Sequence, residues 1–186
     1  MRTEEELIEK ILGGEWRNFA ILVEKYQAKV YSYVFYLMHT REDAEEVVQD
    51  TFMKAYRSLH QFRGDASFST WLIRIAHHNC LSRFRRKVPD RVSLDNVYDD
   101  SFSGQETDPS QELDLNDRKK ILARALERLK PEERSVVTMY YFNELSISEV
   151  SKVTDLSVSN VKVTLHRSRG KLLNILKEMG IKESTL

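Results

Sequence analysis

SISEVSKVTDLSVSNVKVTLHRSRGKL, residues 146–172, decides how the last part of the chain folds. Ser146 and Glu149 have the spacing of a capping box, which predicts that a helix begins here. Asp155 tolerates the left-handed backbone of a tight turn, and Ser157 is a good N-cap for a second helix. The stretch therefore predicts a helix-turn-helix rather than one interrupted helix.

The second helix of this motif is rich in basic and polar residues. In a DNA-binding helix-turn-helix, this helix lies in the major groove, where cations neutralise phosphates and Arg or Lys donors match guanine acceptors. An exposed basic helix end is the plainer alternative, because the helix dipole favours cations there. The helix cap, the turn and the basic face occur together in this stretch, which favours DNA binding over the plainer alternative. The residues expected to contact DNA are Ser159, Asn160, Lys162, Val163, His166, Arg167, Arg169 and Lys171.

The composition is that of one or two soluble domains, with 186 residues, 41% of them hydrophobic and 31% charged. The zero net charge averages three segments, which carry +2 (residues 1–92), −8 (residues 93–117) and +6 (residues 118–186). No apolar run is long enough for a membrane span, and the acidic N-terminus does not resemble a signal peptide. Together with a single cysteine, Cys80, these features predict a cytoplasmic protein.

Helical periodicity predicts an all-α protein with two small helical domains. The first domain spans residues 1–92, and its helices are expected to begin near Thr3, Trp16, Thr40 and Phe68. Residues 93–114 are rich in Ser, Asp and Gly, which is typical of a flexible acidic linker. The second domain spans residues 115–186, with Pro131 in the first turn of the helix that precedes the helix-turn-helix.

Three stretches resemble, in order, the extracytoplasmic-function (ECF) group of bacterial RNA polymerase sigma factors, within the sigma-70 family. DAEEVVQDTFMKAY (43–56) is similar to region 2.2, FRGDASFSTWLIRIAHHNCLSRFRRK (62–87) resembles regions 2.3 and 2.4, and residues 125–172 resemble region 4. The resemblance covers almost the whole chain. It implies a dissociable polymerase subunit that directs the core enzyme to promoters and helps to melt the −10 element. It implies neither catalysis nor a cofactor or small-molecule substrate.

The same resemblance implies partners and site residues. The partners are core polymerase, through the β′ clamp helices and the β flap, promoter DNA and an anti-sigma factor. The polymerase contact is expected on the outward face of the helix over residues 43–56, because the apolar stripe of that helix faces the domain. The residues on the outward face are Asp43, Glu46, Gln49 and Asp50. An ordinary acidic helix face is the plainer alternative. Region 4 recognises the −35 element through the eight residues of the helix-turn-helix named above.

The resemblance places −10 recognition on residues 62–85, namely Phe62, Arg63, Asp65, Thr70, Trp71, Arg74, His77, His78 and Arg85. Five of them fall within an arc of about 100° on a helix, namely Thr70, Arg74, His77, His78 and Arg85. A basic arc beside aromatic residues suits single-stranded DNA, and the loop before the helix would hold an extruded base. Core packing is the alternative for the aromatic residues.

Some features leave the details open. The chain has His78 where family members often have Asn, and Thr164 where Arg is frequent, so the promoter sequences do not follow from the resemblance. His77, His78 and Cys80 point in different directions on a helix, so no metal site is predicted. The alternatives to a sigma factor are a regulator that binds an operator as a dimer and a protein-interaction scaffold.

Overall fold

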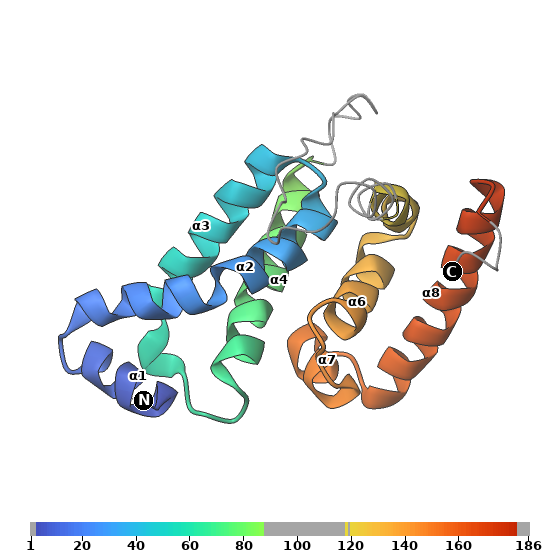
Figure 1. Cartoon of the computed structure of the whole chain (residues 1–186). Coiled ribbons are helices and arrows are strands. Elements are labelled where there is room, and N and C mark those ends of the chain that lie inside the picture. Colours follow the sequence, from blue (N-terminus) through green and yellow to red (C-terminus); the bar gives the residue numbers. More distant parts are fainter. Residues whose placement is uncertain (1–2, 88–117, 119, 182–186) are drawn as a thin grey trace, which may run out of the picture.

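The computed structural model describes residues 3–87, 118 and 120–181 (Figure 1). These residues contain α-helices and two short 3₁₀ turns but no strand, which confirms the all-α prediction. The N-terminal domain consists of α1 (Glu4–Leu12), α2 (Phe19–Met38), α3 (Arg41–Arg57) and α4 (Phe68–Lys87). The C-terminal domain contains helical residues 118 and 120–127, followed by α6 (Pro131–Tyr141), α7 (Ile147–Thr154) and α8 (Val158–Glu178).

Local caps begin the N-terminal helices at the expected places. Thr3 and Glu6 form a capping box at α1, and the Thr40 side chain accepts a hydrogen bond from the backbone of Asp43 at α3. The Ser67 hydroxyl accepts from the backbone N–H of Thr70, one turn into α4. These bonds satisfy amides that a helix start would otherwise leave unpaired. One expectation is wrong: Trp16 lies in a 3₁₀ turn before α2 and is 59% exposed.

The helix-turn-helix forms as the sequence predicts. Ser146 and Glu149 make a complete capping box at α7, and the Ser157 side chain caps α8 by accepting from the backbone N–H of Asn160. Asp155 ends α7 with φ 58° and ψ 17°, the left-handed conformation that a tight turn between helices requires. Val150 and Val161 are fully buried where the two helices pack together.

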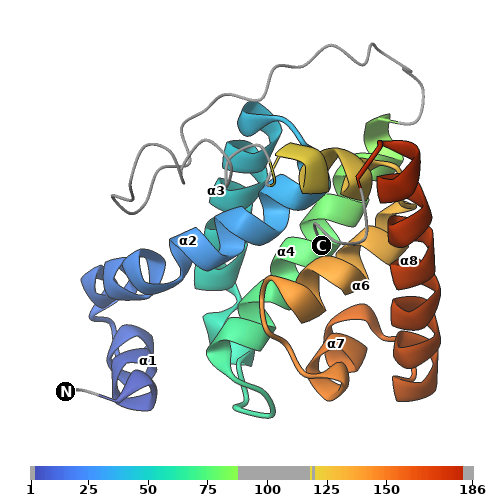
Figure 2. The ribbon, with the colours of Figure 1, turned by 45° about the vertical axis from the view of Figure 1, so that its right-hand side comes forward.

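The two domains pack against each other (Figure 2). Helix α6 lies on α2, α7 lies on α4, and α8 lies on the side of the C-terminal domain away from α2 and α3. The predicted linker, residues 93–114, falls outside the described residues. None of the described helices is both long and apolar enough to cross a membrane. The packing between domains was not expected, and it determines which candidate residues are accessible.

Candidate functional site

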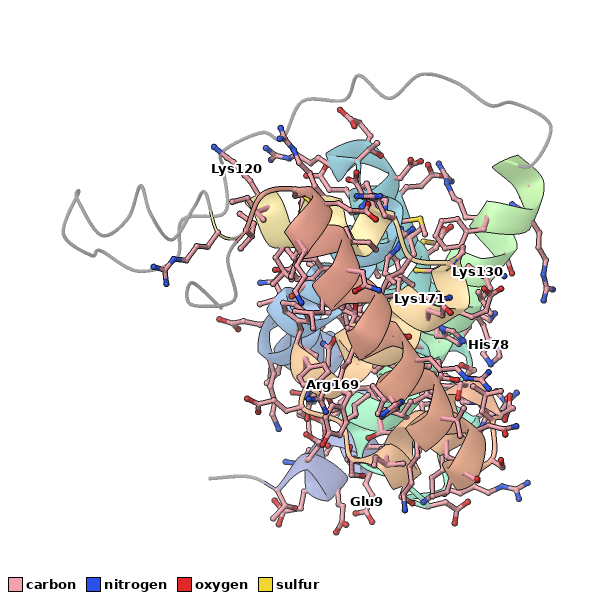
Figure 3. All side chains as sticks on the ribbon, turned by 90° about the vertical axis from the view of Figure 1, so that its right-hand side faces the viewer. Glu9, His78, Lys120, Lys130, Arg169 and Lys171 are labelled. Atoms are coloured by element: carbon pink, nitrogen blue, oxygen red, sulfur yellow. The ribbon has the colours of Figure 1, made fainter. Side chains whose placement is uncertain are left out.

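Helix α8 presents its polar face to solvent along its first four turns. Val161 and Leu165 point into the domain and anchor the helix against α6 and α7. Figure 3 looks onto α8, with Arg169 and Lys171 along it. Lys171 forms an ion pair with Glu133 of α6. All eight candidate residues for duplex DNA are exposed: Ser159, Asn160, Lys162, Val163, His166, Arg167, Arg169 and Lys171.

Helix α4 carries the other DNA candidates, and only part of that face is accessible. His78 and Arg85 are exposed, and the Arg74 side chain is 45% exposed. Thr70 and His77 are only 2% and 4% exposed, because the C-terminal domain covers them. The predicted arc therefore exists as a helix face, but two of its members are buried between the domains.

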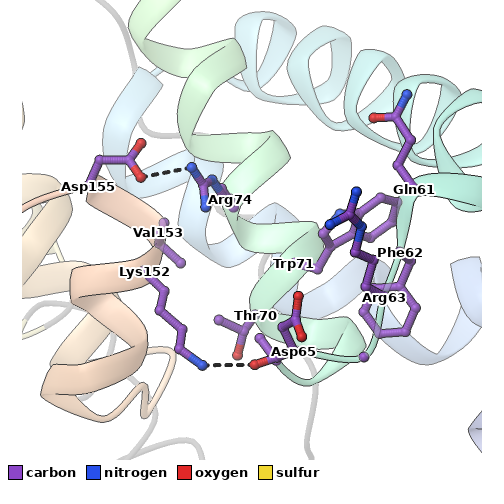
Figure 4. Close-up of a pocket in the computed structure, with 12 residues that line it drawn as sticks. Gln61, Phe62, Arg63, Asp65, Thr70, Trp71, Arg74, Lys152, Val153 and Asp155 are labelled. Carbon is purple, nitrogen blue, oxygen red and sulfur yellow. Dashed lines mark hydrogen bonds and ion pairs between the residues drawn. The ribbon is translucent and has the colours of Figure 1, made fainter.

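The loop before α4 forms the wall of a cavity of about 380 Å³ (Figure 4). Arg63, Asp65 and Trp71 line it from the N-terminal domain, and Lys152 and Asp155 line it from α7. The cavity is large enough for a small planar group, as the prediction that this loop holds an extruded base requires. Its far side belongs to the other domain, which a sequence argument confined to one motif could not anticipate.

The aromatic residues beside this cavity also belong to the core. The rings of Phe62, Phe68 and Trp71 pack together with centroid separations of 5.4–5.6 Å. Phe68 is 1% exposed, whereas Phe62 and Trp71 are partly buried and keep an edge towards the cavity. Core packing therefore accounts for Phe68, and both a packing role and a binding role are open to Phe62 and Trp71.

The three residues of the HHNC stretch differ in environment. Burial, and then the neighbouring His78, lower the pKa of His77 to about 4. Burial raises the pKa of the Cys80 thiol to about 12, which leaves it protonated and unreactive. Among the described residues, no group of three or more potential metal ligands comes together.

Helix α3 carries the residues expected to contact polymerase. Gln49 and Asp50 are exposed, and the Glu46 side chain is 54% exposed. The expectation that Asp43 points outward is wrong, because Asp43 is 8% exposed and accepts hydrogen bonds from Thr40 and from Arg83 of α4. Arg83 also donates to Glu46 at 2.6 Å. These carboxylates, Glu46 first, raise the pKa of the Arg83 guanidinium and tie α3 to α4.

Beside Gln49 lies an apolar groove of about 490 Å³ between α2 and α3. Phe19 and Val23 of α2 form one wall, and Met53 and Tyr56 of α3 form the other. Met53 and Tyr56 are each 45% exposed and lie next to each other in the same groove, so they form a contiguous apolar surface. The sequence prediction missed this groove, although the spacing of Gln49, Met53 and Tyr56 on α3 places them on one face.

Sequence reasoning also missed the polar residues at the domain interface. Tyr33 Oη, Ser135 Oγ and His77 Nδ1 form a triangle of hydrogen bonds with sides of 2.8–3.0 Å. Arg134 donates to the carbonyl oxygen of Leu37 at 2.9 Å. The only signal in the sequence is a charged and a hydroxyl residue, Arg134 and Ser135, at the start of an otherwise apolar helix turn.

Comparison with protein families identifies both domains. Residues 22–88 match the model of sigma-70 region 2, and residues 119–172 match that of sigma-70 region 4. The chain is 34% identical to the RNA polymerase sigma factor YlaC of Bacillus subtilis over 148 residues, covering 80% of this chain and 86% of that protein. It is 32% identical to the ECF RNA polymerase sigma-E factor of Escherichia coli over 174 residues, covering 90% and 91%.

Solved structures give the same result. CnrH, solved in complex with the cytosolic domain of CnrY, aligns with a TM-score of 0.68 at 25% identity, over 92% of this chain and 96% of that chain. The sigma factor RpoE of Bartonella quintana, solved with the anti-sigma factor NepR, has the same fold, with a TM-score of 0.69 at 19% identity over 87% and 98%. Family models, relatives and fold agree, and this chain belongs to the ECF sigma factors of the sigma-70 family.

Proposed function

We propose that three separate surfaces carry out the work of this RNA polymerase sigma factor. The exposed face of α3 binds core polymerase, α4 and the loop before it bind the melted −10 strand, and the exposed face of α8 binds the −35 duplex. The observation that carries this proposal is the face of α8, on which the exposed side chains are polar or basic apart from Val163, directly after the left-handed turn at Asp155.

The polymerase surface combines the groove with its polar margin. Met53 and Tyr56 offer apolar area to a partner helix, and Gln49 and Asp50 offer polar groups beside it. An apolar centre with a polar rim is the usual form of a protein interface. The occupant of this groove is the clamp coiled coil of the β′ subunit, and region 4 meets the β flap.

The −10 surface combines cations with a pocket. Arg74 and Arg85 of α4 neutralise phosphates, and His78 adds a polar group on the same face. An extruded base enters the cavity beside Trp71, where stacking and hydrogen bonds offset the few kcal/mol, roughly, that extrusion costs. On this assignment His77 and Thr70 act only when the C-terminal domain has moved away from α4.

Three further features complete the proposal. The protein works in the cytoplasm, where its polymerase and promoters are. It positions DNA and polymerase and catalyses no reaction itself. An anti-sigma factor regulates it, which the solved complex of RpoE with the anti-sigma factor NepR supports by analogy.

The polymerase assignment is tested by a double substitution, Gln49→Ala with Asp50→Lys. Both side chains are exposed on α3, so we expect weaker capture of core polymerase, by about tenfold, with unchanged helical circular dichroism. The control is Glu144→Lys, a charge reversal at an exposed residue between α6 and α7. Equal capture of core enzyme by the double variant and the control would exclude this face of α3.

The promoter assignment is tested with the reconstituted holoenzyme on a promoter library. We expect transcription to start from a narrow class of promoters with two sequence elements, and only when core polymerase is present. Tight binding of the free chain to a palindromic site as a dimer, without a stoichiometric complex with core polymerase, would support an operator-binding regulator instead.

A further inference from the structure

The cavity between α4 and α7 has one wall from each domain, and its lining mixes apolar and charged groups. Its volume of about 380 Å³ lies in the range of about 300–1,000 Å³ that small-molecule sites occupy. Figure 4 shows Arg63 and Trp71 on one side of this space and Lys152 and Asp155 on the other. The packed chain therefore contains a site of ligand size that neither domain possesses alone.

Two cations at this cavity lack a carboxylate partner. Lys152 Nζ uses one of its three donors, on the backbone carbonyl oxygen of Asp65 at 2.8 Å. Neither Lys152 nor Arg63 forms an ion pair with any of the residues that the structure describes, whereas Arg74 is paired with Asp155 at 2.7 Å. The two unpaired cations come from opposite walls, so an anionic group that enters the cavity finds charges that need not leave another partner.

The apolar part of the lining is aromatic. Phe62 and Trp71 are partly buried and keep an edge towards the cavity. Phe68, which is 1% exposed, contacts both rings and holds them in place. A planar ring of a ligand can therefore pack against Trp71 without any rearrangement of the core, and contacts between rings contribute more than the burial of their area alone.

The carboxylate of Asp65 narrows the class of ligand. Its side chain has no hydrogen bond or ion pair to any residue in the described part of the chain. A ligand that covers this carboxylate must offer it N–H donors, because a charge that loses water without gaining a partner is costly. Inorganic phosphate and simple aromatic acids offer no N–H group. A nucleotide offers a phosphate for the cations, a planar base for Trp71 and N–H donors for Asp65, and guanine has two such donors side by side.

We propose that this cavity binds a free guanine nucleotide while the two domains are packed together. The base lies against Trp71 with its N–H edge at Asp65, and the phosphate binds the cations Lys152 and Arg63. Because the ligand contacts both domains, its binding stabilises their packing in proportion to its occupancy. The site shares Arg63 and Trp71 with the proposed −10 surface, but it also needs Lys152 of α7 and does not rest on the −10 role.

The test is isothermal titration calorimetry of the full-length free protein with guanosine monophosphate (GMP). We expect one site per chain with a dissociation constant of about 0.1 mM. Adenosine monophosphate (AMP) should bind about fivefold more weakly, because adenine offers Asp65 a single amino group. Inorganic phosphate should give no signal over the same concentrations. The absence of saturable binding of GMP, or equal affinity for GMP and inorganic phosphate, would overturn the nucleotide site.

Two variants and a control assign the walls of the site. Lys152→Ala removes the cation of α7 at an exposed helical position, and we expect it to weaken GMP binding by about tenfold. Asp65→Asn should abolish the preference for GMP over AMP. The matched control is Lys54→Ala, which removes an exposed lysine of α3 that does not line the cavity and should leave GMP affinity unchanged.

The outcomes separate this site from the proposed function. Unchanged GMP affinity in Lys152→Ala, or an equal loss in Lys54→Ala, would overturn a site shared by the two domains. A preference for GMP that survives Asp65→Asn would overturn the assignment of guanine. Each of these results leaves the −10 and −35 roles untouched, because those roles are tested with the holoenzyme on promoters.

Discussion

The two DNA surfaces of this sigma factor differ in how the fold exposes them. Helix α8 displays its whole polar face, whereas the corresponding face of α4 is divided between exposed residues such as His78 and buried ones such as His77. Both faces were expected from similar sequence features, namely basic residues at helical spacing. The comparison teaches that a nucleic-acid face is defined by what packs on it as much as by its own residues.

The difference originates in the C-terminal helices that lie on α4: Ser135 of α6 contacts His77, and Glu149 of the small helix α7 contacts Thr70. Val150 and Val153 are both fully buried, and α7 contacts α8 on one side and α4 on the other. A helix of two turns has little apolar surface of its own, so it is stable only between larger elements. In filling this position α7 supports α8 and at the same time covers α4.

The largest expected effect comes from Arg134→Ala. Arg134 is 6% exposed and donates to the carbonyls of Leu37, Glu127 and Leu129, so its loss leaves buried acceptors unpaired. We expect a loss of about 3 to 5 kcal/mol in the free energy of unfolding. The two domains should then unfold in separate steps on denaturant titration, and the two DNA faces should become equally accessible.

The control for that experiment is Arg128→Ala. Arg128 lies in the same domain and pairs with Glu178, but both side chains are about half exposed, at 49% and 60%. Its removal should cost less than about 1 kcal/mol and leave a single unfolding transition. Similar losses for the two arginines would mean that Arg134 does not hold the domains together.

Lowering the pH should reduce the difference in accessibility between the polar faces of α8 and α4. The pKa of His77 is lowered to about 4 where the two domains pack together, against an ordinary value near 6.5 when exposed. The packed domains bind fewer protons than separated domains would, so the stability of the domain packing is complete above pH 6.5 and falls as the pH drops towards 4. At pH 5 the loss is about 2 kcal/mol, which should appear as an increase in the radius of gyration between pH 7 and pH 5.

His77→Gln is the control for this pH response. Several groups face the His77 ring, from four elements: Tyr33 (α2), Arg74 and His78 (α4), Ser135 (α6) and Asp155 at the end of α7. Burial, and then Arg134, lower the pKa of His39 to about 3, so His39 adds a response of the same sign. At pH 5 the two histidines contribute about equally, so the variant should lose about half of the expansion. If His77→Gln expanded between pH 7 and pH 5 as much as the wild-type protein, protonation of His77 would not be the cause of the expansion.

The smallest effect concerns specificity on the exposed face. Arg167→Ala should cost about 1 to 2 kcal/mol on the preferred −35 sequence and relax sequence choice, if Arg167 contacts a base edge. Arg169→Ala should weaken all sequences alike and reduce the salt dependence of binding. Binding-site selection with both variants makes the distinction, and an unchanged preference in Arg167→Ala would reject the base contact.

Local features of the fold could be predicted from the sequence because their signals are local. Thr40, Ser146 and Ser157 start helices through bonds to amides three residues away, and Asp155 marks its own turn. The position of Asp43 could not be predicted in this way. Its partner Arg83 is 40 residues distant, and on the helix alone Asp43 resembles any exposed acid of a first turn.

The domain interface is beyond sequence reasoning for the same physical reason. Tyr33 and Ser135 are 102 residues apart, and an apolar or mixed helix face looks the same in sequence whichever partner covers it. The motif placed the candidate residues on the correct helices, but it could not distinguish an exposed Arg167 from a covered His77. That distinction depends on a contact between two motifs, each of which is complete without the other.

The two tryptophans of the chain differ in the same way as the two DNA faces. Trp71 lines the cavity between α4 and α7 and touches Phe62 and Phe68, whereas Trp16 is exposed beside Arg17. In a Trp16→Phe protein the remaining indole therefore reports on the cavity alone. Departure of α7 would hydrate that indole and shift its fluorescence emission to longer wavelength, so the chain carries its own optical signal for separation of the domains.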